Sequence, residues 1–115
     1  KRRQVAEDYL LDLKSDTSGL KLPHVADYGK PVWHLFVIRH PSRDVIAARL
    51  AEQGIQTVIH YPVPPHQQKG YPELHGLTLP LTEIIHQEVL SLPISPAMDD
   101  DSTRRVIETI NKLLV

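Results

Sequence analysis

The sequence contains no cysteine among its 115 residues. This absence excludes a disulfide framework, a thiolate nucleophile and a zinc site built on cysteine. The formal net charge of -1 gives no reason to expect nucleic acid as a partner. No apolar run approaches the ~20 residues of a transmembrane helix, and no signal-peptide core lies near the start. We therefore expect a soluble, cytoplasmic protein that does not enter a membrane.

Several catalytic motifs are also missing. The sequence has no Gly-x-Ser-x-Gly, no phosphate-binding loop and no Gly-x-Gly-x-x-Gly, and caps or turns explain its serines. A length of 115 residues with 41% hydrophobic residues fits one compact domain, residues 1–115. A helical pattern is already running at Lys1 without a cap before it. This start predicts that the domain is a piece of a longer polypeptide.

The periodicity of apolar residues predicts seven elements in alternating order. Helices are expected over residues 2–14, 43–53, 82–90 and from an acidic start at 99–102 onward, and strands over 32–39, 55–60 and 91–94. Ser42 is the expected N-cap of the second helix, and Gly54 its stop. This order predicts an α/β fold, specifically an α+β sandwich. Its small sheet is expected to be three-stranded and mostly antiparallel, with helices on one face.

The most unusual segment is His60-Tyr61-Pro62-Val63-Pro64-Pro65-His66. A histidine at a strand end beside a stiff proline loop is suited to contact a ligand, because its pKa lies near neutrality. A plainer interpretation is a strand-end histidine that bonds a nearby backbone carbonyl. A zinc site on His60 and His66 is not expected: Glu73 and His75 are the only candidates for the further ligands that zinc requires.

The stretch over residues 32–94 resembles a known family. It contains Val-Trp-His-Leu-Phe-Val-Ile-Arg, Gly-Ile-Gln-Thr-Val-Ile-His-Tyr-Pro, Pro-His-Gln-Gln, Leu-Pro-Leu-Thr-Glu and Ser-Leu-Pro-Ile-Ser-Pro, in that order. This succession resembles the C-terminal small domain of the DegT/DnrJ/StrS family of nucleotide-sugar aminotransferases. Each piece alone is weak, but the ordered set is specific.

The resemblance implies a homodimer of the aspartate-aminotransferase fold. A large N-terminal domain would hold pyridoxal phosphate on a lysine, and the small domain would line the substrate entrance. The family transfers an amino group, typically from glutamate, to a keto sugar joined to a nucleotide. The His-Tyr-Pro-x-Pro-x-His form of the loop resembles members that act on keto-deoxy sugars joined to dTDP.

The resemblance also assigns roles to individual residues. His60 matches the family histidine that faces the sugar and orients it without acting as the main base. Tyr61 would shape the same rim, and His66 matches a neighbour of this site. Arg39 and Arg43 match family positions that are either structural or in contact with the nucleotide phosphates.

The sequence departs from the family in lacking the cofactor lysine. The settings of Lys14, Lys21, Lys30, Lys69 and Lys112 do not resemble that lysine's motif. We therefore expect the isolated chain to bind no cofactor and to be inactive, with pyridoxal phosphate held in the parent enzyme. The alternative is a stand-alone α/β module that binds a small ligand or regulates another protein.

Overall fold

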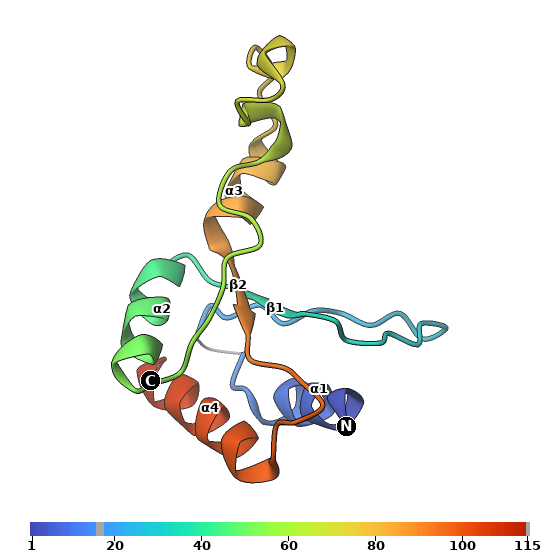
Figure 1. Cartoon of the computed structure of the whole chain (residues 1–115), viewed down its shortest axis with the longest axis vertical. Helices are drawn as coiled ribbons and strands as arrows, with labels where there is room; N and C mark the ends of the chain where they lie inside the picture. Colours follow the sequence, from blue (N-terminus) through green and yellow to red (C-terminus); the bar gives the residue numbers. More distant parts are fainter. Residues whose placement is uncertain (16–17, 115) are drawn as a thin grey trace.

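The computed structural model describes residues 1–15 and 18–114, which form a body and a long arm (Figure 1). The elements, in order, are α1 (Arg2–Asp12), β1 (Phe36–Arg39), α2 (Arg43–Glu52), the short 3-10 helices η1 (Pro65–Gln67) and η2 (Pro72–Leu74), α3 (Pro80–Glu88), β2 (Val89–Leu92) and α4 (Asp100–Leu113). We call residues 61–88 the arm. It rises away from α1, α2, α4 and the sheet, which make up the body.

The sheet is antiparallel, as expected for this α/β fold, but it has fewer strands than predicted. Across the described residues it has two strands, β1 and β2, with Phe36 opposite Leu92 and Ile38 opposite Leu90. The strand expected over residues 55–60 contributes a single bridge, between Val58 and Ser91. Beyond that bridge the chain turns into the arm, where prolines offer no N–H to a ladder. A three-stranded sheet was therefore the wrong prediction.

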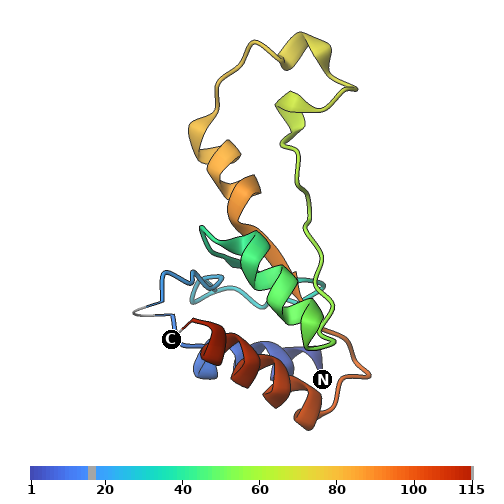
Figure 2. The ribbon, with the colours of Figure 1, turned by 90° about the vertical axis from the view of Figure 1, so that its left-hand side faces the viewer.

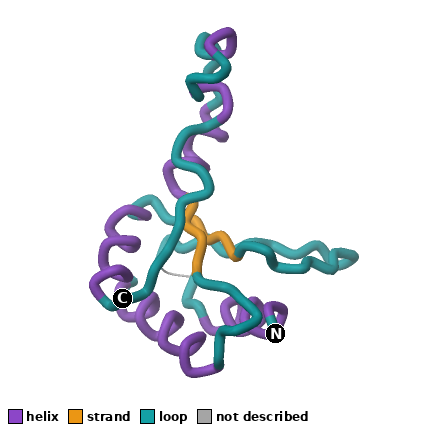
Figure 3. The backbone as a smooth tube through the Cα atoms, viewed as in Figure 1, coloured by secondary structure: helices purple, strands orange, loops and turns teal. Residues whose placement is uncertain are grey.

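One face of the sheet carries the core. Side chains alternate along a strand, so Phe36 and Ile38 share a face with their partners on β2. Helices α1, α2 and α4 cover this face with Tyr9, Leu50 and Ile110, all fully buried. The tube in Figure 3 shows the orange strands above α1 and α4 and beside α2. The core of the sandwich thus lies between this face of the sheet and the three helices.

Tyr9 is the polar exception within this core. Its ring packs against Phe36 with centroids 4.9 Å apart, and its hydroxyl donates to the Pro93 carbonyl at 2.8 Å. Burial raises the pKa of the Tyr9 phenol, so the hydroxyl stays a donor at neutral pH. This bond satisfies the one polar atom that the side chain brings inside.

The helix ends partly follow the sequence signals. Helix α2 follows Ser42 as predicted, and Gly54 just beyond its end has a positive φ of 72°. The Ser42 hydroxyl makes no capping bond, which corrects that detail; its backbone N–H donates instead to His40 Nδ1 at 2.9 Å. Helix α3 begins at Pro80 rather than at Thr82, because proline is well suited to the first turn.

The acidic start of α4 is an effective cap. Asp99 Oδ1 accepts a hydrogen bond from the Ser102 backbone N–H at 2.7 Å. Bonds from Ser102 hold the pKa of the Asp99 carboxyl below its usual range. The charged form therefore persists at neutral pH, where it also favours the positive end of the helix dipole.

The arm makes the molecule elongated. The principal extents of the whole molecule are 47 × 34 × 28 Å. Its radius of gyration is 15.3 Å, against about 13 Å for a compact domain of ~100 residues. Figure 2 shows residues 61–71 running outward and α3 returning to the body. Helix α3 passes into β2 without a loop, from Glu88 to Val89. No helix in the described part of the chain is long and apolar enough to cross a membrane.

Candidate functional site

The corner formed by His60 and Tyr61 lies where the chain leaves the sheet for the arm. His60 Nδ1 is 2.8 Å from the hydroxyl oxygen of Ser91, a buried residue of β2. The His60 and Tyr61 rings meet edge to face, with centroids 5.5 Å apart, and the peptide bond between them is cis. The expected pair of side chains is therefore together, at the base of the arm.

One ring nitrogen of His60 is engaged and the other is available. The partner of Nδ1 is a hydroxyl, not the backbone carbonyl that the plainer interpretation of this histidine supposed. Among residues 1–15 and 18–114, no hydrogen bond to Nε2 is found. Tyr61 is 64% exposed beside it. The corner can thus present an imidazole nitrogen and a phenol hydroxyl to a polar ligand.

His66 has a different environment. Its side chain is 3% exposed, and Nε2 lies 3.0 Å from Glu83 Oε1. Its Nδ1 is buried and has no partner in the described structure. A direct contact between His66 and a substrate stays a prediction, because in this conformation the ring has almost no open surface.

Glu83 receives two hydrogen bonds at one oxygen. The Leu79 backbone N–H donates to Oε1 at 2.9 Å, and His66 Nε2 lies on the same atom. The Leu79 bond, followed by the His66 bond, holds the pKa of the Glu83 carboxyl below its usual value. An ionised carboxylate only accepts, so His66 must carry its hydrogen on Nε2.

Arg39 holds the base of the arm to the body, and Arg43 contacts β2 directly after the arm. Arg39 binds Glu88 Oε2 through Nε and Nη2, at 3.2 and 2.8 Å. Arg43 is 7% exposed; its Nη1 donates to the Val89 carbonyl at 2.9 Å, and its Nε pairs with Asp44. These contacts engage both guanidinium groups within the protein.

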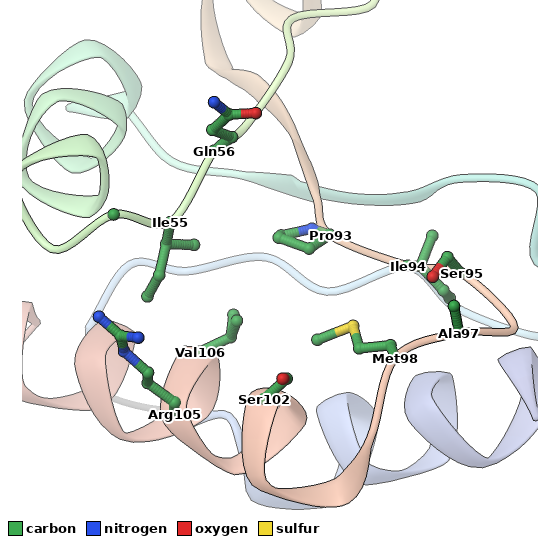
Figure 4. Close-up of a pocket in the computed structure, with 11 residues that line it drawn as sticks. Ile55, Gln56, Pro93, Ile94, Ser95, Ala97, Met98, Ser102, Arg105 and Val106 are labelled. Carbon is green, nitrogen blue, oxygen red and sulfur yellow. The ribbon is translucent and has the colours of Figure 1, made fainter.

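A separate pocket of about 430 Å³ lies on the body, and the sequence did not predict it (Figure 4). Ile55, Met98 and Val106 line it with apolar side chains, and Arg105 stands at one side. Arg105 Nη2 donates to the Gln53 carbonyl. The pocket contains none of the histidines. No group of three metal-binding side chains occurs among the residues that the structure describes.

Sequence reasoning also missed Ser91, Glu83 and His86 as members of the site. His86 Nδ1 lies 2.5 Å from the Tyr61 carbonyl oxygen. These partners are 17 to 31 residues from the histidines or tyrosine they contact. No local pattern reports contacts over such separations.

Superposition on solved structures shows first that the chain has the fold of a part of an aminotransferase. The chain superposes on the crystal structure of DesV from S. venezuelae in complex with a ketimine intermediate, with a TM-score of 0.91 and 37% identity over 98% of this chain and 31% of that one. It also superposes on NtdA from Bacillus subtilis with bound cofactor PMP, with a TM-score of 0.86 and 32% identity, covering 98% of this chain and 27% of that one.

The sequence comparison then gives the family. Residues 1–111 match the DegT/DnrJ/EryC1/StrS aminotransferase family, and the chain belongs to it. It is 47% identical over 112 residues to the dTDP-3-amino-3,6-dideoxy-alpha-D-galactopyranose transaminase of Aneurinibacillus thermoaerophilus. This match covers 97% of the chain but 30% of the relative. The chain thus spans about a third of the length of the relatives it matches.

Proposed function

We propose that this chain is the C-terminal small domain of a pyridoxal-phosphate-dependent aminotransferase. Its substrate would be a keto-deoxy sugar joined to dTDP, and its amino donor typically glutamate. The observation that carries the proposal is the 47% identity, over nearly the whole chain, to a dTDP-sugar transaminase. A large domain outside this chain and a second copy in a homodimer would complete the enzyme. The cytoplasmic location stays a prediction.

His60 and Tyr61 are the residues we assign to the sugar. Ser91 engages Nδ1 of His60, which leaves Nε2 to bond a sugar hydroxyl or carbonyl. Tyr61, with its exposed ring, forms the rim. We assign Arg39 and Arg43 to structure rather than to the nucleotide phosphates, because Glu88 and the Val89 carbonyl already receive their hydrogen bonds.

The lysines of this chain do not fit the cofactor. A lysine that holds pyridoxal phosphate needs an enclosed site in which its amine is desolvated. All six lysines of the chain are exposed. When bound in the parent enzyme, the cofactor supplies the electron sink for amino transfer. We propose that residues outside this chain hold it.

The isolated chain provides a direct test of the cofactor assignment. After mixing with pyridoxal phosphate and desalting, we expect no retained visible absorption band and no borohydride-fixed adduct by mass spectrometry. Bovine serum albumin treated in the same way controls for non-specific lysine labelling. A stoichiometric adduct on one lysine of this chain would contradict the assignment.

The role of His60 is tested in the longer enzyme. His60→Asn keeps a nitrogen near the position of Nδ1 but removes Nε2, whereas His60→Gln places an amide near Nε2. Losing one hydrogen bond of about 0.5–1.5 kcal/mol should raise KM for the dTDP-sugar about 3- to 10-fold in the Asn variant. In the Gln variant KM for the dTDP-sugar should rise less than in the Asn variant. The glutamate half-reaction should be unchanged in both variants. Normal sugar kinetics in both variants would contradict the role.

A further inference from the structure

The arm has almost no apolar interior. Of residues 61–88, all of them described, only Pro64 and His66 are buried. Seven large apolar side chains of the arm are exposed instead: Tyr61, Val63, Tyr71, Leu77, Leu79, Leu81 and Ile84. Burial of apolar surface, which holds the body together, therefore cannot by itself fix the shape of the arm.

Three histidines cross the arm between its outgoing limb, residues 61–71, and its return limb, residues 72–88. His66 Nε2 reaches Glu83 Oε1 at 3.0 Å. His75 Nε2 reaches the Gln68 carbonyl oxygen at 3.0 Å. His86 Nδ1 reaches the Tyr61 carbonyl oxygen at 2.5 Å. Each of these bonds joins one limb to the other.

The acceptors determine which nitrogen of each ring carries hydrogen. A carbonyl oxygen only accepts, so His86 must donate from Nδ1 and His75 from Nε2. The Glu83 carboxylate likewise requires the hydrogen of His66 on Nε2. A neutral imidazole has one N–H, so each bond selects one tautomer. His86 should thus differ from the other two.

The bond of His86 lies at the proposed sugar-binding corner. It holds the carbonyl of Tyr61, while Ser91, five residues after His86, holds the ring of His60. Backbone bonds between Val58 and Ser91, at 2.8 and 3.2 Å, fix the chain just before the corner. The segment 86–91 therefore holds the corner on both sides.

We propose that His86 is a positioning residue for His60 and Tyr61. Its imidazole does not touch the sugar; it fixes the Tyr61 carbonyl and, through it, the two side chains that bind. The His66–Glu83 and His75–Gln68 bonds keep the two limbs of the arm together. The substrate part of this inference rests on the proposed function, whereas the hydrogen bonds do not.

Tautomers in the 115-residue chain test the bonds themselves. Long-range ¹H–¹⁵N correlation spectra of histidine-labelled chain, recorded where the rings are neutral, should show His86 with hydrogen on Nδ1. His66 and His75 should carry it on Nε2. Hydrogen on Nε2 of His86, or rapid averaging of its two nitrogens, would overturn the proposal.

Variants of the longer enzyme test positioning and do not depend on how the isolated chain behaves. His86→Asn places an amide N–H near the position of Nδ1, whereas His86→Gln places it one bond further out. We expect His86→Gln to raise KM for the dTDP-sugar about 3- to 10-fold, the effect of one lost hydrogen bond, without changing the glutamate half-reaction. His86→Asn should restore a near-normal KM. Equal KM values in the two variants would overturn the proposal.

His60→Asn, assayed in parallel, separates the two possible failures. A raised KM in His60→Asn with a normal KM in His86→Gln would overturn the positioning role and leave the proposed function standing. A normal KM in both would overturn the sugar site itself, and the positioning role with it. The tautomer of His86 would then report only on the structure of the arm.

Discussion

In the body, α1, α2 and α4 bury Tyr9, Leu50 and Ile110 against the sheet, whereas the arm buries only Pro64 and His66. The body is held by apolar area, which is not directional and tolerates small shifts. The arm is held by single hydrogen bonds that need specific atoms in specific places. The candidate site lies where these two kinds of structure meet.

This difference teaches that stability and function can be separated along the chain. Regions with few buried apolar contacts open locally at a lower free energy than the core does. The arm should therefore loosen before the body unfolds. Changes in the body should move the global free energy of unfolding, and changes in the arm should not.

The largest effect is expected from Phe36→Ala. The ring is fully buried between Tyr9 and Trp33, so its removal leaves a cavity in the centre of the core. The free energy of unfolding should fall by about 3–5 kcal/mol, measured by urea denaturation. Val37→Ala, on the neighbouring half-buried position, is the control. A loss below about 1 kcal/mol would mean that the body is not held by this core.

An intermediate effect is expected where the arm joins the body. Arg43→Met removes the donor to the Val89 carbonyl and keeps most of the aliphatic stem. An unsatisfied buried carbonyl should lower the free energy of unfolding by about 1–3 kcal/mol. Arg49→Met, on the exposed side of the same helix, should change little. Equal decreases in the free energy of unfolding in the two variants would show that the buried hydrogen bond of Arg43 does not contribute to stability.

The smallest effect is expected on the arm. Leu77 is 50% exposed, so Leu77→Ser should change the free energy of unfolding by no more than about 0.5 kcal/mol. The same urea titration measures it, with Leu50→Ser as the buried counterpart. A loss close to that of Leu50→Ser would erase the distinction between arm and body.

The sequence predicted the body better than the arm. Helix α2 lies between Ser42 and Gly54 as expected, and α4 begins within the acidic run, with Asp99 as its N-cap and Asp100 and Asp101 in its first turn. Local periodicity and caps report such helices directly. The strand expected over residues 55–60 did not form, because Val58 and Ile59 favour an extended chain but a ladder also needs a partner over several residues.

The candidate site was predicted in part. His60 and Tyr61 were identified from their setting beside the prolines and from the family resemblance. Their partners were not identified: Ser91, Glu83 and His86. Each contact joins residues far apart in the sequence, and no periodicity of the sequence indicates such a contact. The burial of His66 could not be foreseen either, since Glu83 reaches it from the return limb.

The direct passage from α3 into β2 also limits how this family member can change in length. One residue inserted between Glu88 and Val89 would turn the side chains of β2 to the opposite faces of the sheet. It would also rotate α3, and His86 on it, about the axis of the helix. The exposed turn at Gly70, between η1 and η2, has no such coupling. Insertions and deletions among relatives should therefore collect at the tip of the arm and avoid its base.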